Sequence, residues 1–180
     1  MIITISGLPG SGKTTTAKNL AEKLGYKFWS MGDMRGEIAK RHGMTIDELN
    51  QVGKTEKWTD EEVDVFQTSL GKTQNNFIME AWVGYHFIPH SIKIFLEVDP
   101  TVGAQRVYRD QRPDEPHQDS VATVQRMLEK RLRETKERYT RYYGIADFTD
   151  RRHFDFVLDT THLNQEQVLD RVLAYLKTRV

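Results

Sequence analysis

A stretch near the start of the chain matches the phosphate-binding loop pattern G-x-x-x-x-G-K-[ST] at every fixed position; its residues are Gly7, Leu8, Pro9, Gly10, Ser11, Gly12, Lys13 and Thr14. Glycines in such a loop let backbone N–H groups curl around an anion, and the N-terminus of a following helix adds a partial positive charge. The ammonium group of Lys13 can reach the β- and γ-phosphates, and the hydroxyl of Thr14 can ligate Mg²⁺. The stretch therefore predicts a binding site for a nucleoside triphosphate.

The residues on either side of this loop predict the strand and the helix that it needs. Met1–Ser6 is a short apolar run rich in β-branched residues, which is typical of a buried parallel strand. After Thr14 the apolar residues recur at helical spacing until Gly25 ends the pattern. A strand, a glycine-rich turn and a helix thus follow one another in the order that points backbone N–H groups at a phosphate.

A second set of candidates lies on a long helix, which we expect from Asp119 to about Tyr143. Phosphoryl transfer needs positive charges around the transferring group, and this helix is rich in arginine. At about 100° per residue, Arg131 and Arg138 fall together on one flank of its apolar stripe, so we expect them to bind the transferring phosphate and to be catalytic. The alternative is ordinary surface ion pairs with neighbouring glutamates. The remaining arginines point to the opposite, solvated face: Arg126, Arg133 and Arg141.

Three further arginines are candidates for nucleotide binding. Arg106 and Arg109 are one helical turn apart ahead of the long helix, and we expect them to contact ATP, Arg106 by stacking on the base or by reaching a phosphate. A solvated surface position is the alternative for both. Arg35 follows a predicted strand and Gly32, on the first turn of a predicted helix, where it can grip the phosphate of an acceptor.

The predicted acceptor side contains carboxylates and an aromatic residue. Glu80 ends a predicted strand, where its carboxylate could hold Mg²⁺ through water or orient the acceptor. Asp64, Gln67 and Thr68 share one face of an acidic helix and could hydrogen-bond a base or a sugar, although simple solvation is an open alternative for Asp64. Trp82 could stack on a base or fill an apolar pocket.

Five apolar runs alternate with helical patterns along the chain, which predicts an α/β fold: three α/β/α layers around a five-stranded parallel sheet. The strands are expected at Met1–Ser6, Tyr26–Ser30, Asn76–Glu80, Ser91–Asp99 and Phe154–Thr160. Two insertions should project over the carboxyl ends of these strands, where ligands of open α/β sheets bind. We expect an acceptor-binding insertion at about 31–73 and an Arg-rich lid at about 106–143.

Helix boundaries within the first insertion follow from capping signals. Helices are expected at Asp33–His42, Thr45–Gln51 and Thr59–Leu70. Thr45 and Thr59 each precede a glutamate by three residues, so both should form capping boxes.

The bulk composition limits the classes of protein. A length of 180 residues suits a single domain covering 1–180. Lys plus Arg equals Asp plus Glu at 26 each, so no overall charge attracts the chain to a nucleic acid polymer or a membrane. The absence of cysteine excludes disulfides, thiolate catalysis and Cys-based zinc sites. No run approaches a membrane span and the N-terminus resembles a strand rather than a signal peptide, so we expect a cytoplasmic protein. We also expect it to be a monomer or a weak homodimer.

Together these motifs make the chain resemble the nucleoside monophosphate kinases of the P-loop kinase group, and within them the archaeal-type cytidylate kinases. The likeness covers nearly the whole length, and its most specific part is Arg138–Ile145, an Arg-Tyr-x-x-x-Tyr-Gly-Ile element. It also includes Met1–Thr15, Gly32–Arg35 and Phe154–Thr160. The resemblance implies transfer of the γ-phosphate of ATP to CMP or dCMP with Mg²⁺. It also implies that ATP lies on the loop, Thr15 included, and that the lid carries Arg131 and Arg138.

One segment departs from the family pattern. Relatives usually have Glu-Gly-Arg after the third strand, with the Arg contacting the acceptor phosphate, whereas this chain has Glu80-Ala81-Trp82. Loss of that Arg removes a charge-assisted contact worth about 1.5–3 kcal/mol. Two alternatives to a cytidylate kinase therefore stay open: a P-loop kinase with a changed small-molecule acceptor, and a nucleotide-binding regulatory protein with weak ATPase activity.

Overall fold

The computed structural model describes residues 1–111 and 117–179, and its five strands form one parallel sheet in the order β2-β3-β1-β4-β5. The strands are β1 (Ile2–Gly7), β2 (Lys27–Ser30), β3 (Phe77–Glu80), β4 (Ile92–Glu97) and β5 (Phe156–Asp159). All five strands predicted from the sequence are confirmed, with ends that differ by at most two residues. Because β1 lies between β3 and β4, the loop that follows β1 emerges at the centre of the carboxyl edge of the sheet.

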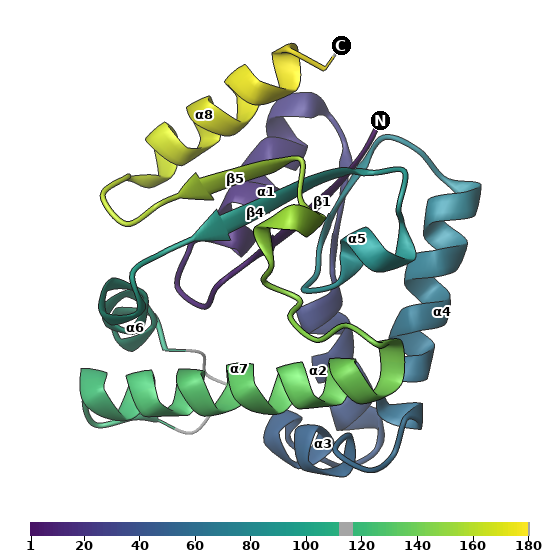
Figure 1. Cartoon of the computed structure of the whole chain (residues 1–180), viewed down its shortest axis with the longest axis vertical. Helices are drawn as coiled ribbons and strands as arrows, with labels where there is room; N and C mark the ends of the chain where they lie inside the picture. The colour runs from purple at the N-terminus through teal and green to yellow at the C-terminus, as the bar shows by residue number, and fades with distance from the viewer. Residues whose placement is uncertain (112–116, 180) are drawn as a thin grey trace.

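Helices cover both faces of the sheet, so the three-layer α/β/α architecture is confirmed (Figure 1). One face packs against α1 (Lys13–Leu24) and α8 (Gln165–Lys177). The other face packs against α2 (Met31–Arg41), α3 (Ile46–Val52) and α4 (Trp58–Thr73). Near this second face lie the short helix α5 (Gly84–Phe87) and a 3-10 turn at Arg151–His153.

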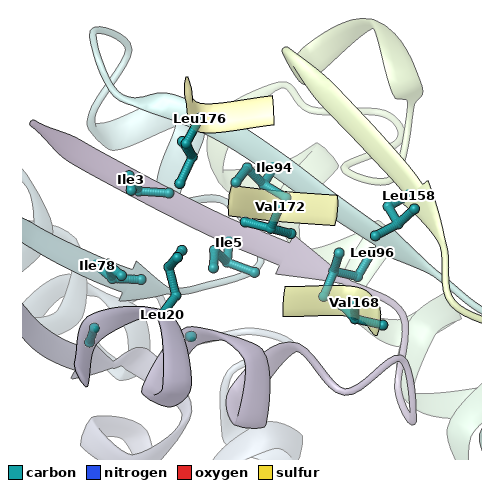
Figure 2. Close-up of a cluster of buried hydrophobic side chains, with 12 residues drawn as sticks. Ile3, Ile5, Leu20, Ile78, Ile94, Leu96, Leu158, Val168, Val172 and Leu176 are labelled. Atoms are coloured by element: carbon teal, nitrogen blue, oxygen red, sulfur yellow. The ribbon is translucent and has the colours of Figure 1, made fainter. Parts of the chain in front are cut away.

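The core beneath α1 and α8 holds the central strands in place (Figure 2). Ile3 and Ile5 of β1 are fully buried on this face. Because side chains alternate between the two faces of a strand, Ile2 packs on the opposite face, in the cluster with α2, α3 and α4. This period-2 pattern with apolar residues on both sides is what a central parallel strand requires. The helices contribute Leu20 from α1 and Val172 from α8, both fully buried. A rigid strand therefore leads directly into the loop predicted to bind phosphate.

The helices of the first insertion begin where polar side chains can cap them, with one exception to the predicted pattern. Thr45 and Glu48 form the expected capping box at α3. The capping box predicted at Thr59 is wrong: α4 begins at Trp58, and the Thr59 hydroxyl donates to the carbonyl oxygen of Glu56. Thr59 is fully buried, so its hydroxyl takes the nearest carbonyl inside the preceding turn.

The start of α2 also differs from the prediction. The helix begins at Met31, and the hydroxyl of Ser30 accepts from the backbone N–H of Asp33, so Ser30 is the N-cap. Arg35 consequently lies on the second turn rather than on the first, farther from the positive end of the helix.

The second insertion contains α6 (Pro100–Arg109) and the long helix α7 (Val121–Tyr143), which pack against each other (Figure 1). Asp99 caps α6 by accepting from the backbone N–H groups of Thr101 and Val102. Gly144, with a φ of 71°, ends α7 as predicted. The part of the predicted lid at 112–116 lies outside the described residues. Figure 1 shows α7 passing below the sheet, from α6 at one end to α3 and α4 at the other.

No helix in the described ranges is both long enough and apolar enough to cross a lipid bilayer.

Candidate active site

The loop between β1 and α1 has the backbone conformation of an anion-binding turn. Gly10 and Gly12 have φ values of 74° and 83°, in the left-handed region that favours glycine. A Cβ atom on Gly10 would lie 2.3 Å from the carbonyl oxygen of Gly103 in α6, so that position requires glycine for space as well as for conformation. The loop is thus held against α6 while Lys13 begins α1.

Glu80 lies beside this loop because β3 is the neighbour of β1. Its carboxylate is 5% exposed and accepts a hydrogen bond of 3.0 Å from the Ser30 hydroxyl. Its other oxygen lies 4.0 Å from the Lys13 ammonium nitrogen. A buried carboxylate with a lysine at this distance keeps the ammonium group oriented near the mouth of the loop.

A cleft of about 240 Å³ extends from the loop along the carboxyl edge of the sheet. At about 10–15 Å³ for each water on this measure, it has room for roughly 16–24 waters, which suits a nucleotide-sized ligand rather than a single ion. Both insertions contribute to its walls. Nine of the seventeen site residues predicted from the sequence line this cleft: Pro9, Gly10, Lys13, Arg35, Asp64, Glu80, Trp82, Arg131 and Arg138. The other predicted residues do not line it: Gly7, Leu8, Ser11, Gly12, Thr14, Thr15, Arg106 and Arg109.

At the floor of the cleft, Asp60 of α4 joins an arginine from each insertion. The guanidinium of Arg35 bonds the Asp60 carboxylate and donates to Asn50 Oδ1 at 3.1 Å. The guanidinium of Arg138 lies 3.4 Å from the other Asp60 oxygen and donates to the same Asn50 oxygen at 3.4 Å. All three charged side chains are nearly buried, at 11%, 4% and 6% exposed for Arg35, Asp60 and Arg138.

The electrostatics of this cluster favour an added anion. Burial and the nearby charge of Arg138 hold the pKa of Arg35 below its usual value, while Asp60 acts in the opposite direction. An arginine remains protonated under these conditions, so two guanidinium groups share one carboxylate. The cluster therefore carries a net positive charge within a largely desolvated cleft.

The arrangement of α7 agrees with the helical-face argument. Arg126, Arg133 and Arg141 are exposed, whereas Arg131 and Arg138 line the cleft. The alternative of an ordinary surface arginine is wrong for Arg138, which is 7% exposed. Arg131 is 25% exposed and lies 3.8 Å from Asp47 of α3.

Deeper along α4, Asp64 and Gln67 line the same wall of the cleft. The hydroxyl of Tyr143, from α7, donates to Asp64 Oδ2 at 2.7 Å. Burial raises the pKa of Asp64 to about 6, although the bond from Tyr143 acts in the opposite direction. Simple solvation of Asp64 is therefore excluded. Thr68 instead donates to the main-chain carbonyl of Asp64.

Trp82 fills an apolar pocket on one side and lines the cleft on the other. Its ring stacks on Phe148 with centroids 5.2 Å apart and an interplanar angle of 19°. Phe148 is 1% exposed and packs against Tyr139 of α7. The position where the family pattern predicts an arginine is thus occupied by an aromatic ring, which α7 supports through Phe148.

The two arginines of α6 have different environments. Arg106 is half-buried and donates to the carbonyl oxygens of Gly10 at 3.3 Å, Thr160 at 2.9 Å and Thr161 at 3.1 Å. It therefore ties the phosphate-binding loop to the turn after β5, and the alternative of a freely solvated Arg106 is wrong. Arg109 is exposed at the end of α6. Contact of either residue with ATP stays a prediction.

Sequence reasoning did not identify several residues that shape the cleft. Asp60 and Asn50 were not singled out because a buried counter-ion and a surface residue give the same local pattern. Gly103 was missed because its close approach to the loop joins two distant segments. Tyr143 was singled out only as part of a family element, whereas its hydroxyl in fact binds Asp64.

Comparison with known proteins agrees with this geometry. Residues 2–162 match the cytidylate kinase-like family. The chain is 33% identical to a cytidylate kinase of Sulfolobus acidocaldarius, over 99% of this chain and 96% of that protein. It is also 28% identical to an S-adenosylmethionine-dependent nucleotide dehydratase of Lacinutrix mariniflava, but spans only 35% of that protein's length.

Solved structures agree on the fold. Shikimate kinase from Bacteroides thetaiotaomicron superimposes with a TM-score of 0.67 and 17% identity, covering 98% of each chain. The family match over most of the chain and the archaeal relative above 30% identity lead to one conclusion: the chain belongs to the cytidylate kinase-like family of P-loop kinases, and it is a nucleoside monophosphate kinase.

Proposed function

We propose that this enzyme transfers the γ-phosphate of ATP to CMP or dCMP, giving the nucleoside diphosphate and ADP. The observation that carries the proposal is the single cleft that joins the Lys13 loop to Arg35, Arg131 and Arg138. A donor phosphate on the loop and an acceptor phosphate at the arginines would then face each other within one partly desolvated space. The relatives named cytidylate kinase support the choice of base.

In this proposal the donor side is the loop and its surroundings. The loop Gly7–Thr15 would surround the β- and γ-phosphates with those of its backbone N–H groups that are not bonded within the protein, and Lys13 would neutralise the charge between the phosphates. Arg106 and Arg109 of α6 would contribute on the same side; Arg106 already binds the carbonyl of Gly10 and so fixes the loop.

On the acceptor side, Arg35 would hold the monophosphate while Arg131 and Arg138 follow the transferring group. An acceptor phosphate oxygen would attack the γ-phosphorus as the bond to the β–γ bridging oxygen breaks, and ADP would leave. Asp64 and Trp82 would contact the nucleoside. Three arginines lining one cleft would supply the positive charge for the acceptor phosphate, with Trp82 adding none.

The donor atoms at the loop fit Mg²⁺. This cation prefers hard oxygen ligands, and the hydroxyl of Thr14 on the first turn of α1 and the buried carboxylate of Glu80 provide them, Glu80 through water. When bound, Mg²⁺ would neutralise charge on the β- and γ-phosphates. Lys13 and Ser30 would keep the Glu80 carboxylate oriented toward that position.

Trp82 is the observation that favours a second candidate, a P-loop kinase with another small-molecule acceptor. An aromatic ring supplies no charge for a second phosphate contact but does supply a stacking surface. The relative named a nucleotide dehydratase does not support a third candidate, because this chain matches only 35% of it.

A coupled assay of ADP release over a panel of acceptors tests the proposal. With ATP and Mg²⁺, we expect CMP and dCMP to stimulate turnover most strongly, with UMP weaker and ATP alone giving a low background. A panel in which no nucleoside monophosphate raises turnover above the ATP-only rate contradicts it. Stimulation by a non-nucleotide acceptor instead would favour the second candidate.

The same proposal describes the enzyme as one domain acting on free nucleotides in the cytoplasm, as a monomer or weak homodimer. The near-complete coverage of the archaeal relatives supports the single domain. Sedimentation at micromolar concentration would test the oligomeric state, because a tight dimer would persist on dilution.

A further inference from the structure

The most deeply buried polar side chain among the described residues that line the cleft has no hydrogen-bond partner for its oxygen. Gln67 of α4 is 2% exposed, and its side-chain oxygen has no hydrogen-bond partner within the described residues. Gln67 nevertheless lines the cleft. Leaving a buried amide oxygen without a partner is unfavourable, so the position of this oxygen indicates that a ligand supplies the missing donor.

The apolar residues that line the cleft suit a flat heterocycle. Val63 lies one turn before Gln67 on α4, and Met31 of α2 and Trp82 also line the cleft. Ligand sites of this type combine apolar walls with a few well-placed polar groups that fix orientation. The amide of Gln67 presents one acceptor and one donor, which matches the paired hydrogen-bonding edge of a nucleobase.

An amide alone would not distinguish an amino base from an oxo base, because its oxygen and nitrogen can exchange places by rotation. Asp64 supplies the discrimination between an amino base and an oxo base. It lies three residues before Gln67 on the same helix, and both line the cleft. Tyr143 occupies Asp64 Oδ2, which leaves Oδ1 to accept from a ligand. Since burial raises the pKa of Asp64 only to about 6, the carboxylate is ionised at neutral pH and favours an amine over a carbonyl oxygen.

We propose that Gln67 is a base-reading residue: its buried oxygen accepts a hydrogen bond from the exocyclic amine of the acceptor's cytosine, and Asp64 beside it selects that amine against the carbonyl of uracil. This inference rests on the proposed function, since it assigns how the acceptor of that reaction is recognised. It places the base along α4 and the phosphate at the cluster of Arg35, Asp60 and Arg138.

A cycle of enzyme and substrate variants measures the Gln67 contact. The substrates are CMP and its 4-deamino analogue, which lacks only the amine, and the enzymes are wild type and Gln67→Met. A good paired contact to a base gives roughly 5- to 150-fold discrimination, so wild type should prefer CMP to the analogue by that factor in kcat/KM. In Gln67→Met the preference should fall at least fivefold, with the KM for ATP unchanged. Gln74→Met, the same replacement at an exposed position on the end of α4, should keep the wild-type preference.

Asp64→Asn tests the selection of amine over carbonyl and does not depend on whether Gln67→Met folds. An asparagine can donate to a carbonyl as readily as it accepts from an amine, so the CMP-to-UMP ratio of kcat/KM should fall at least fivefold. Calorimetric binding of CMP and UMP to each variant provides a readout that needs no turnover. Circular dichroism establishes that each variant is folded.

The possible results separate this inference from the proposed function. If wild type phosphorylates CMP while folded Gln67 and Asp64 variants retain their preferences, the base-reading inference is overturned and the kinase assignment stands. If no monophosphate is phosphorylated, but wild type binds CMP in preference to UMP and the variants lose this binding preference, the proposed function fails and the base-reading role is supported. A preference lost equally in Gln74→Met would also overturn it, because the effect would not be specific to the cleft.

Discussion

Replacement of Asp60 by asparagine tests whether the charged cluster under the cleft is built as described. The substitution keeps the shape of the side chain and removes its charge. It leaves the guanidinium groups of Arg35 and Arg138 facing each other with their shared counter-ion gone. Since both arginines are nearly buried, solvent can compensate only in part.

The expected size of the effect follows from burial. Removing one partner of a buried ion pair costs about 3–5 kcal/mol, because the remaining charge is left uncompensated. For a chain of this length, each kcal/mol of stability shifts the midpoint of thermal unfolding by about 2–4 °C. Asp60→Asn should therefore lower the midpoint by roughly 6–20 °C. The KM of the acceptor should rise and that of ATP should stay constant, because the proposed function places both misplaced arginines on the acceptor side.

Asp47→Asn is the matched control. Asp47 also faces an arginine, Arg131, but its side chain is 54% exposed, and exposed pairs contribute only about 0–1 kcal/mol. Thermal unfolding followed by circular dichroism, on both variants in the same buffer, gives the comparison. Equal midpoints for Asp60→Asn and Asp47→Asn would refute the description of a buried network that depends on one carboxylate.

Four other substitutions have defined outcomes. Lys13→Ala should reduce phosphoryl transfer at least about 100-fold in a folded protein, and near-normal turnover would contradict the loop assignment. Arg35→Ala should raise the acceptor KM by about 10- to 150-fold, the equivalent of a charged hydrogen bond, and equal changes for both substrates in steady-state kinetics would exclude an acceptor clamp. Gly10→Ala should abolish ATP binding measured by calorimetry. The φ of 74° at this position disfavours any side chain, and a Cβ atom would lie 2.3 Å from the carbonyl oxygen of Gly103. A wild-type affinity for ATP would show instead that the loop can move to accept the side chain. The pKa of Asp64 is about 6 in the folded protein, above its unfolded value, so the folded state binds this proton more tightly. The free energy of unfolding of wild type should therefore fall by roughly 1–2 kcal/mol relative to Asp64→Asn as the pH rises from about 4 to 6. Denaturation profiles that stay parallel over this pH range would contradict the prediction.

Much of the fold could be predicted because its signals are local. Apolar runs such as Met1–Ser6 predict the strands correctly, since burial of a strand on both faces imposes a continuous apolar pattern. Asp99 begins a helix and Gly144 ends one, as the chemistry of each residue requires. The capping box predicted at Thr59 does not form because that residue is fully buried and its hydroxyl donates to the Glu56 carbonyl, so tertiary contacts override the local preference.

The candidate site was predictable only in part for the same reason. Helical spacing correctly separated Arg131 and Arg138 from the exposed arginines of the long helix. It could not reveal that Arg138 shares a carboxylate with Arg35, which lies about a hundred positions earlier in the chain. Such pairing depends on how two insertions fold over the sheet edge, and no local pattern encodes it.

The sequence by itself was enough to predict a donor side, because a phosphate-binding loop is a contiguous segment whose glycines and lysine act together through backbone geometry. On the acceptor side the sequence predicted candidates such as Arg35 and Asp64, and only the tertiary structure brings them into one cleft. There Asp60, Gln67 and Tyr143 come from separate turns and elements, and each acquires its role from the burial and the neighbours that folding provides. Residues that look like ordinary helix-surface positions in the sequence form, once buried, the charged cluster and the part of the cleft lined by α4.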